Sequence, residues 1–201
     1  MDARKIANPL ALAVLALLHE GPTHPYEMGR TLRERRKEQS IKLNYGSLYT
    51  VVRQLLAAGL IAERGTTREG ARPDRTIYAL TPAGEEELRD WMRELVSTPQ
   101  KEYRQFEAAL ALLGVLPPEA VLTLLRERLD HLQAETEVGR AELRRAEAAG
   151  LEPFFLIEDE YRFALLDAER AWVQGLIARI AHGDDFTRPW REYHARRGTT
   201  E

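Results

Sequence analysis

The order of the elements in the first 80 residues most constrains how this chain can fold. Apolar residues recur with helical spacing in three short segments, and two β-prone segments follow them. We expect helices over residues 9–20, from residue 25 onward and over about residues 44–58, and strands over residues 61–64 and 76–80. Three helices followed by a two-stranded hairpin are the plan of a winged helix-turn-helix.

Two of the helices have strong start signals. Asn8 precedes Pro9, and Thr81 precedes Pro82, so each pair supplies a capping side chain and a proline at the first helical position. The second helix has Tyr26, Met28 and Leu32 as its apolar positions. The fourth helix, from Thr81 to about Val96, carries the apolar positions Leu88, Trp91, Met92 and Leu95.

The third helix has one aliphatic face and one polar face. Leu48, Val52, Leu55 and Leu56 line the first face, and Ser47, Tyr49, Thr50, Arg53 and Gln54 share the second. A helix with small or polar side chains on its outer face fits the major groove of B-DNA, where such groups reach base edges and phosphates. Asn44 and Tyr45 lie at the N-terminus of this helix, where backbone N–H groups and the positive end of the helix dipole attract phosphate. They are therefore further candidates for DNA contacts. An alternative for Tyr49 is that its ring packs against the second helix and exposes only the hydroxyl.

The hairpin is expected to have a long basic tip. It carries Arg64, Arg68, Arg72 and Arg75, which we expect to meet phosphates as a set. The predicted DNA-binding residues are therefore Asn44, Tyr45, Ser47, Tyr49, Thr50, Arg53, Arg68, Arg72 and Arg75. A second basic cluster, Arg33, Arg35, Arg36 and Lys37, has an alternative explanation, because cations stabilise the end of a helix.

Charge is divided unevenly along the chain. Residues 1–80 contain 13 Lys and Arg against 8 Asp and Glu, whereas residues 81–201 contain 16 against 24. A basic first part favours a polyanionic partner for that part, and an acidic remainder favours protein or solvent. The alternative is chance asymmetry in the solvated surface.

The second half is expected to be helical. A helix over about residues 103–113 precedes a long helix from Pro118, whose leucines at 122, 125, 129 and 132 have coiled-coil spacing that fades at Thr136 and Gly139. A last helix over about residues 154–181 is expected to present one broad apolar face, formed by Ile157, Tyr161, Leu165, Trp172, Leu176 and Ile180. These faces are more apolar than a monomer needs, which favours a homodimer; the alternative is packing of the two helices within one chain.

The predicted fold class is mainly α, with an N-terminal winged helix-turn-helix that has a two-stranded β-wing and a C-terminal α-helical dimerisation domain. We place the DNA-binding domain at residues 1–97, the helical dimerisation and effector domain at 98–182, and a flexible tail at 183–201.

Several function classes are disfavoured by the sequence. The chain has no cysteine, its five histidines lack the helical zinc spacing, and it carries no phosphate loop, dinucleotide fingerprint or Ser/His/Asp order. We therefore expect no enzymatic activity, no metal and no cofactor. No apolar run is long enough to span a membrane, and we expect a cytoplasmic protein. The alternative function is a winged-helix adaptor that binds a protein and not DNA.

Ordered motifs add a family resemblance. "YEMGRTL" on the second helix, Gly46, Leu48 and Tyr49 on the third, "GLI" at its end and "YALTPAG" after the wing make the first 95 or so residues resemble the PadR family of bacterial transcriptional regulators. The second half resembles the longer helical domain of one PadR subfamily. The sequence departs from the common pattern at Thr50, where many members have proline, and at the wing tip from Gly70 to Pro73.

The resemblance implies a function. PadR members bind an operator, commonly as repressors, and dimerise through their C-terminal helices, and in this chain Tyr49 is the foremost DNA-contact candidate. Some members respond to aromatic compounds that stack on aromatic side chains near the dimer interface. The corresponding effector candidates are Trp91, Trp172 and Tyr161.

Overall fold

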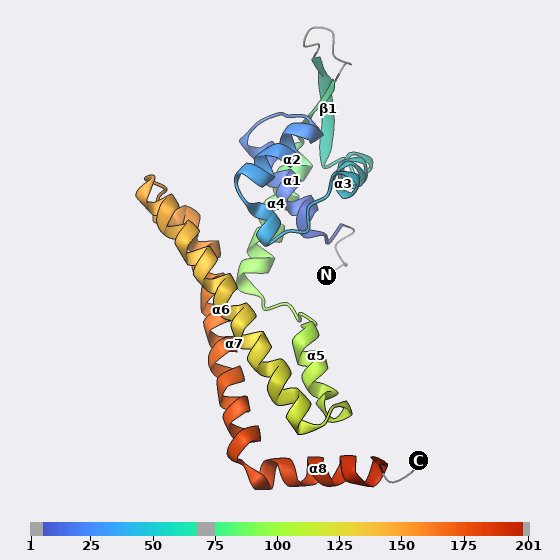
Figure 1. Ribbon diagram of the computed structural model, residues 1–201. Coiled ribbons are helices and arrows are strands. Elements are labelled where there is room, and N and C mark those ends of the chain that lie inside the picture. Colours follow the sequence, from blue (N-terminus) through green and yellow to red (C-terminus); the bar gives the residue numbers. More distant parts are fainter. Residues whose placement is uncertain (1–5, 68–74, 199–201) are drawn as a thin grey trace. The chain divides into compact units, whose positions relative to one another are not determined.

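A computed structural model describes residues 6–67 and 75–198 of the protein (Figure 1). The chain forms two compact units, Met1–Lys101 and Glu102–Glu201. The mainly helical architecture, with a two-stranded sheet in the first unit, confirms the predicted fold class.

The first unit contains four α-helices and a hairpin within its described residues. Its elements are α1 (Pro9–Glu20), α2 (Pro25–Glu34), the 3-10 turn η1 (Lys37–Gln39), α3 (Tyr45–Ala57), β1 (Ile61–Thr67), β2 (Arg75–Leu80) and α4 (Pro82–Ser97). Both predicted caps form. The Asn8 side chain accepts a hydrogen bond from Leu10 N at 2.9 Å, and the Thr81 hydroxyl accepts one from Gly84 N at 3.0 Å.

The core of the first unit surrounds α1. Seven of the twelve residues of α1 are buried, and leucine and valine side chains of α3 pack against them together with Met28 and Trp91. Tyr26 does not share this core, because 48% of it is exposed. Of the three apolar positions expected on the second helix, Met28 and Leu32 are buried and Tyr26 is not.

The hairpin is an antiparallel pair that is bound at its base to the helices. Ile61 pairs with Leu80 and Thr67 with Arg75, and the register shifts between Glu63 and Gly65. The Thr81 hydroxyl lies within 2.8 Å of Gly59 O and 3.0 Å of Leu60 O, so one side chain links the end of α3, the hairpin and the start of α4.

The start of α4 lies against the chain that enters β1. A Cβ atom at Gly84 would stand 2.0 Å from Leu60 O, a distance that no side chain tolerates. Glycine is therefore the residue that lets α4 begin directly beside the hairpin. This close approach fixes the wing relative to the helical core.

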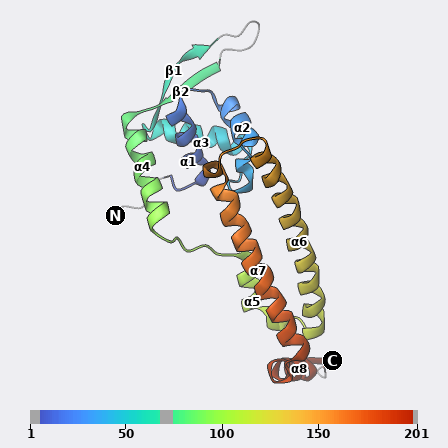
Figure 2. The ribbon, with the colours of Figure 1, turned by 90° about the vertical axis from the view of Figure 1, so that its left-hand side faces the viewer.

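The second unit is a helical hairpin with two shorter helices. Its elements are α5 (Gln105–Ala111), η2 (Leu113–Val115), α6 (Pro118–Ala148), η3 (Pro153–Leu156), α7 (Ile157–His182) and α8 (Asp184–Gly198). α6 and α7 lie side by side along their length in both views (Figures 1 and 2). Their core contains the buried residues Val121, Leu125, Val173, Leu176 and Ile180.

The α6 helix continues beyond the point where its leucine pattern fades. Thr136 is buried and donates its hydroxyl to Leu132 O at 2.7 Å. A Cβ atom at Gly139 would lie 2.7 Å from a ring carbon of Phe163, so the glycine makes room for the Phe163 ring. Small residues thus extend the α6–α7 contact where leucines are absent.

The apolar face predicted for the last helix is only partly correct. Leu176 and Ile180 are buried, as predicted, but Ile157, Tyr161 and Trp172 are exposed. Phe163 and Val173 are buried instead, because α6 packs against the side of α7 that carries them.

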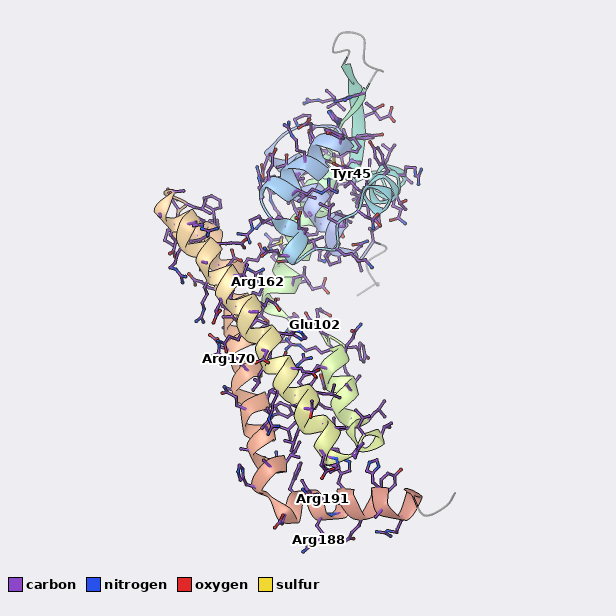
Figure 3. All side chains as sticks on the ribbon, viewed as in Figure 1. Tyr45, Glu102, Arg162, Arg170, Arg188 and Arg191 are labelled. Carbon is purple, nitrogen blue, oxygen red and sulfur yellow. The ribbon has the colours of Figure 1, made fainter. Side chains whose placement is uncertain are left out.

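The segment expected as a flexible tail from residue 183 forms helix α8 over residues 184–198. The Trp190 indole donates to Leu116 O at 2.9 Å, and His194 Nε2 lies 3.0 Å from Gly114 O. Arg191, labelled in Figure 3, pairs with Glu119 at 3.1 Å. These partners are at least 72 residues away in sequence, which explains why local patterns did not predict the helix.

Candidate nucleic-acid interface

Helix α3 has the two faces that the sequence predicts. Leu48, Val52 and Leu55 are buried, as is Val51, which the sequence analysis did not single out, while Leu56 is half-buried. Tyr49 is 47% exposed, and Thr50, Arg53 and Gln54 are also exposed. The buried face holds the helix against α1, so the polar face is presented outward on a rigid support.

The start of α3 is capped by Asn44. Its side-chain oxygen accepts a hydrogen bond from Ser47 N at 2.7 Å, and Asn44 itself is exposed, whereas Ser47 is half-buried. Because that oxygen is occupied, Asn44 has its amide N–H groups left to offer a phosphate or base. Its main role in the free protein is to fix the first turn of α3.

Thr50 and Arg53 are linked on the exposed face. The Thr50 hydroxyl donates to Gly46 O at 3.0 Å and accepts from an Arg53 guanidinium nitrogen at 3.2 Å. A proline at position 50 would lack this hydroxyl. The departure from the common PadR pattern therefore provides a side-chain partner for Arg53.

Tyr49 lies on the exposed face of α3, the helix that contacts β1 of the hairpin. Burial raises the pKa of Tyr78 on β2, and the Glu63 carboxylate and then Tyr49 raise that pKa further. About half of the surface of Tyr49 is exposed, on the helix that a winged helix places at DNA.

The tyrosine that packs its ring on α2 is Tyr45. A Cβ atom at Gly29 of α2 would lie 2.8 Å from Tyr45 Cε1, so the ring rests on the glycine. Figure 3 labels Tyr45 near the start of α3. This packing, which was the alternative for Tyr49, is made by the tyrosine one turn earlier in α3.

Three aromatic rings form a stack that the sequence pattern did not predict. The Tyr26 ring lies 6.0 Å from the Tyr45 ring at an interplanar angle of 9°, and 6.1 Å from the His24 ring at 25°. We call His24, Tyr26 and Tyr45 the ring stack. In sequence, Tyr26 and Gly29 share the motif "YEMGRTL", which was the one available signal.

Two arginines lie on the ring stack. The Arg33 guanidinium carbon is 4.4 Å from the Tyr45 centroid, and that of Arg75 is 5.6 Å from the Tyr26 centroid. An Arg75 guanidinium nitrogen also lies 3.3 Å from His24 Nε2. Arg75, predicted as a wing contact, is thus held at the start of β2, beside the residue that caps α2.

The basic residues of α2 and its end differ in their partners. Arg30 pairs with Glu27 and Glu34, and Arg35 makes two hydrogen bonds to Glu20, at 2.5 and 2.7 Å. The hydrogen bonds from Arg35 lower the pKa of Glu20, and those bonds raise the pKa of Arg35. Within the described residues, neither Arg33 nor Arg75 has a carboxylate within ion-pair distance.

The wing is described over its two strands, Ile61–Thr67 and Arg75–Leu80. Arg64 is exposed on β1, and Arg75 is half-buried on β2. The predicted contacts Arg68 and Arg72 lie outside the described residues.

The effector candidates have different surroundings. Trp91 is 5% exposed in the core of the first unit, so its ring is used in packing. Trp172 is 48% exposed and meets the Phe106 ring edge-on at 6.2 Å, with Arg128 3.6 Å above that ring. Tyr161 is 65% exposed on the first turns of α7.

Over residues 6–67 and 75–198, no group of three or more His, Asp or Glu side chains is arranged to hold a metal ion. In the same part of the chain, no helix combines the length and the apolar character that crossing a membrane requires.

Known proteins resemble the chain in sequence and in fold. Residues 14–90 match the Transcriptional regulator PadR-like family. The negative transcriptional regulator PadR of Bacillus subtilis (strain 168) is 25% identical over 126 residues, which are 63% of this chain and 68% of that protein.

Crystal structures of Bacillus subtilis PadR share the fold. The complex with operator DNA has a TM-score of 0.68 and 21% identity, and covers 86% of this chain and 99% of its own. The complex with p-coumaric acid has a TM-score of 0.69 and 19% identity, with the same coverage. A Streptococcus mutans protein has a TM-score of 0.60 and 19% identity, covering 85% of this chain and 99% of its own.

Proposed function

The chain belongs to the PadR-like family of transcriptional regulators, and on that premise we propose that it represses transcription by occupying operator DNA. The observation that carries the proposal is the outer face of α3, where Tyr49, Thr50 and Arg53 stand exposed above a buried aliphatic face. A relative, Bacillus subtilis PadR, has been crystallised with operator DNA. The family is one of regulators, and we propose no catalytic role for this chain and a place in the cytoplasm, where the bacterial chromosome lies.

In this proposal, α3 enters the major groove and the wing follows the backbone. Tyr49 supplies a hydroxyl and a ring edge, Arg53 reaches a phosphate or a guanine, and Asn44, Tyr45 and Ser47 surround the positive end of α3. The bond between Thr50 and Arg53 supports this, since it holds the guanidinium on the exposed face.

A homodimer is the proposed binding form. One recognition helix reads few base pairs, and two of them about 34 Å apart read a two-fold symmetric site. Support comes from the second unit, which exposes apolar side chains such as Leu124 and Val138 on α6 and Ile157 on α7. Burying them in a partner would remove apolar surface from water.

An aromatic effector is the proposed release signal. A Bacillus subtilis PadR structure contains p-coumaric acid, and by analogy we propose a small aromatic ligand for the second unit. The exposed indole of Trp172, with Phe106 and Arg128 beside it, offers ring and cation contacts to such a ligand. Tyr161 is the second candidate. The ligand acts by favouring a dimer geometry whose recognition helices no longer match the operator spacing.

The test is fluorescence-anisotropy binding to DNA from upstream of the protein's own coding region, in rising salt. We expect affinity to fall steeply with salt, because phosphate contacts release counterions. Tyr49→Ala is expected to weaken binding about tenfold, the effect of losing roughly 1.4 kcal/mol. Tyr103→Ala is the matched control, since Tyr103 is 84% exposed in the second unit. Salt-insensitive or absent binding would contradict the proposal and favour the adaptor function.

A further inference from the structure

The ring stack is unusual for its exposure. Tyr26 lies between two other rings although 48% of it is open to solvent, so the stack is not explained by core packing. Its members come from two elements: His24 caps the start of α2 and Tyr26 follows it, whereas Tyr45 begins α3. The stack therefore joins the starts of two helices that a winged helix-turn-helix places at DNA.

Three constraints hold the rings in place. Glycine at position 29 leaves room for the Tyr45 ring, which a Cβ atom there would push aside. His24 Nδ1 accepts from Glu27 N at 3.4 Å, which orients the imidazole. Tyr26 then lies between the two rings at stacking distance. The surface beneath Arg33 and Arg75 is consequently ordered before any ligand arrives.

The guanidinium groups of Arg33 and Arg75 are positioned by aromatic rings, and no carboxylate of the described residues neutralises their positive charges. Arg30 and Arg35, from the same part of the fold, have carboxylate partners. Arg33 and Arg75 lie on ring faces instead, and among the described residues no carboxylate pairs with either. A cation–π contact restrains a guanidinium but leaves its positive charge and its N–H donors available to an anion.

We propose that the ring stack holds Arg33 and Arg75 ready for two backbone phosphates of DNA, with Tyr26 as the positioning residue at its centre. This rests on the proposed function and adds a contact surface from α2 and the start of β2 to the predicted face of α3. Ordering side chains in advance reduces the conformational entropy that binding must remove, which strengthens binding.

The proposal makes the effects of Tyr26 and Arg75 depend on each other. In the wild-type background, Arg75→Gln is expected to weaken DNA binding about tenfold and to lower the slope of log affinity against log salt by about 0.9, the value for one phosphate contact. In the Tyr26→Leu background, the same Arg75→Gln change is expected to cost less than about threefold, since the guanidinium is no longer positioned.

Two controls separate this role from a general structural one. Tyr26→Phe keeps the ring, so Arg75→Gln should again cost about tenfold in that background. Arg35→Gln removes an arginine that already pairs with Glu20, and it should leave the salt slope unchanged. Thermal unfolding of each variant shows whether it is folded, and Tyr26→Leu is expected to be folded because Tyr26 is half exposed.

The experiment is the double-mutant cycle of Tyr26 and Arg75, measured by anisotropy on the full-length protein and the same upstream DNA. An equal cost of Arg75→Gln in the wild-type and Tyr26→Leu backgrounds would overturn the positioning role while leaving the proposed function intact. Absence of salt-sensitive binding by the wild type would overturn both. The proposal is supported if Arg75→Gln weakens DNA binding much less in the Tyr26→Leu background and about as much as in the wild type in the Tyr26→Phe background.

Discussion

The two units differ in how completely they bury their own apolar residues. In the first unit, one cluster contains sixteen buried residues, and among the described residues only five large apolar side chains are exposed. In the described part of the second unit, the α6–α7 cluster contains five buried residues and fourteen large apolar side chains are exposed. The units are of nearly equal length, so the difference lies in architecture.

The difference indicates that the two units have different roles. A unit that encloses its own core can present a fixed surface, as the outer face of α3 requires. An elongated helical hairpin leaves apolar positions on both sides, and such exposed patches mark association surfaces. Four predictions test this comparison.

The largest effect is expected in the core of the first unit. Leu55 is fully buried, and Leu55→Ala should lower the free energy of unfolding by about 3 kcal/mol through lost burial and a cavity. Because this core is closed within one chain, the loss should be the same at low and high protein concentration in urea denaturation followed by circular dichroism.

The matched variant in the second unit is Leu125→Ala, at a site that is 4% exposed. Its unfolding midpoint should rise with protein concentration, since association stabilises that unit by mass action. The two units would not differ as stated if the loss of unfolding free energy in Leu55→Ala depended on protein concentration. The same would follow if the unfolding midpoint of Leu125→Ala did not depend on it.

The next effect concerns the proposed dimer. Leu124 is 48% exposed on α6, and Leu124→Asp places a carboxylate where an apolar contact is expected. The dimer dissociation constant should rise about thirtyfold, equivalent to roughly 2 kcal/mol, as measured by sedimentation equilibrium. Thr123→Asp, at the adjacent exposed position, is the control for added charge. If Leu124→Asp associates as tightly as Thr123→Asp, the face that contains Leu124 is not the interface.

A smaller effect tests whether α8 is an integral part of the second unit. Trp190→Phe removes the hydrogen bond to Leu116 O and should destabilise the docking of α8 by about 1 kcal/mol, the usual net value of one such bond. Amide hydrogen exchange along residues 184–198 measures the docking. Trp172→Phe makes the same chemical change on α7 and should leave exchange in α8 unaltered. Equal protection of α8 in both variants would show that the indole bond does not hold it.

The smallest effect is the pH dependence of one ion pair in each unit. The Arg35 hydrogen bonds lower the pKa of Glu20 below 4.5, so the pair stabilises the fold above that pH and the stabilisation is lost as pH falls through the lowered pKa. Both side chains are about half exposed, which limits the contribution to under ~1 kcal/mol. Glu20→Gln should therefore reduce the loss of stability on acidification.

Glu119 in the second unit provides the counterpart. A hydrogen bond from its own backbone, and then one from Arg191, lowers its pKa, so the sign of the pH dependence is the same. Acid titration of unfolding for Glu20→Gln and Glu119→Gln compares the two pairs. A steeper acid dependence in either variant than in the wild type would contradict the assigned sign.

The features that were predictable from sequence are local ones. The Asn8 and Thr81 caps need only neighbouring residues, and the aliphatic face of α3 needs only helical spacing. Helix α8 depends on carbonyls of residues 114 and 116, which no local pattern contains. Sequence reasoning therefore placed the first unit well and left the end of the chain as a tail.

The candidate site, too, could be predicted from sequence only in its local features. The exposure of Tyr49, Thr50 and Arg53 followed from helix periodicity, but the ring stack depends on a glycine of α2 meeting a tyrosine of α3. An aromatic residue at helical spacing is ordinarily a core residue, but Tyr26 is half exposed. Side chains that bridge elements escape a periodicity argument, because their partners are set by tertiary structure.

The Thr81 hydroxyl contacts Gly59 O, Leu60 O and Gly84 N. These contacts connect the wing to α4. Because Gly84 packs closely against Leu60 O, the first turn of α4 cannot rotate freely relative to the hairpin. The start of α4 and the base of the hairpin are therefore coupled, so a rotation of α4 at its first turn would displace the base of the wing with it.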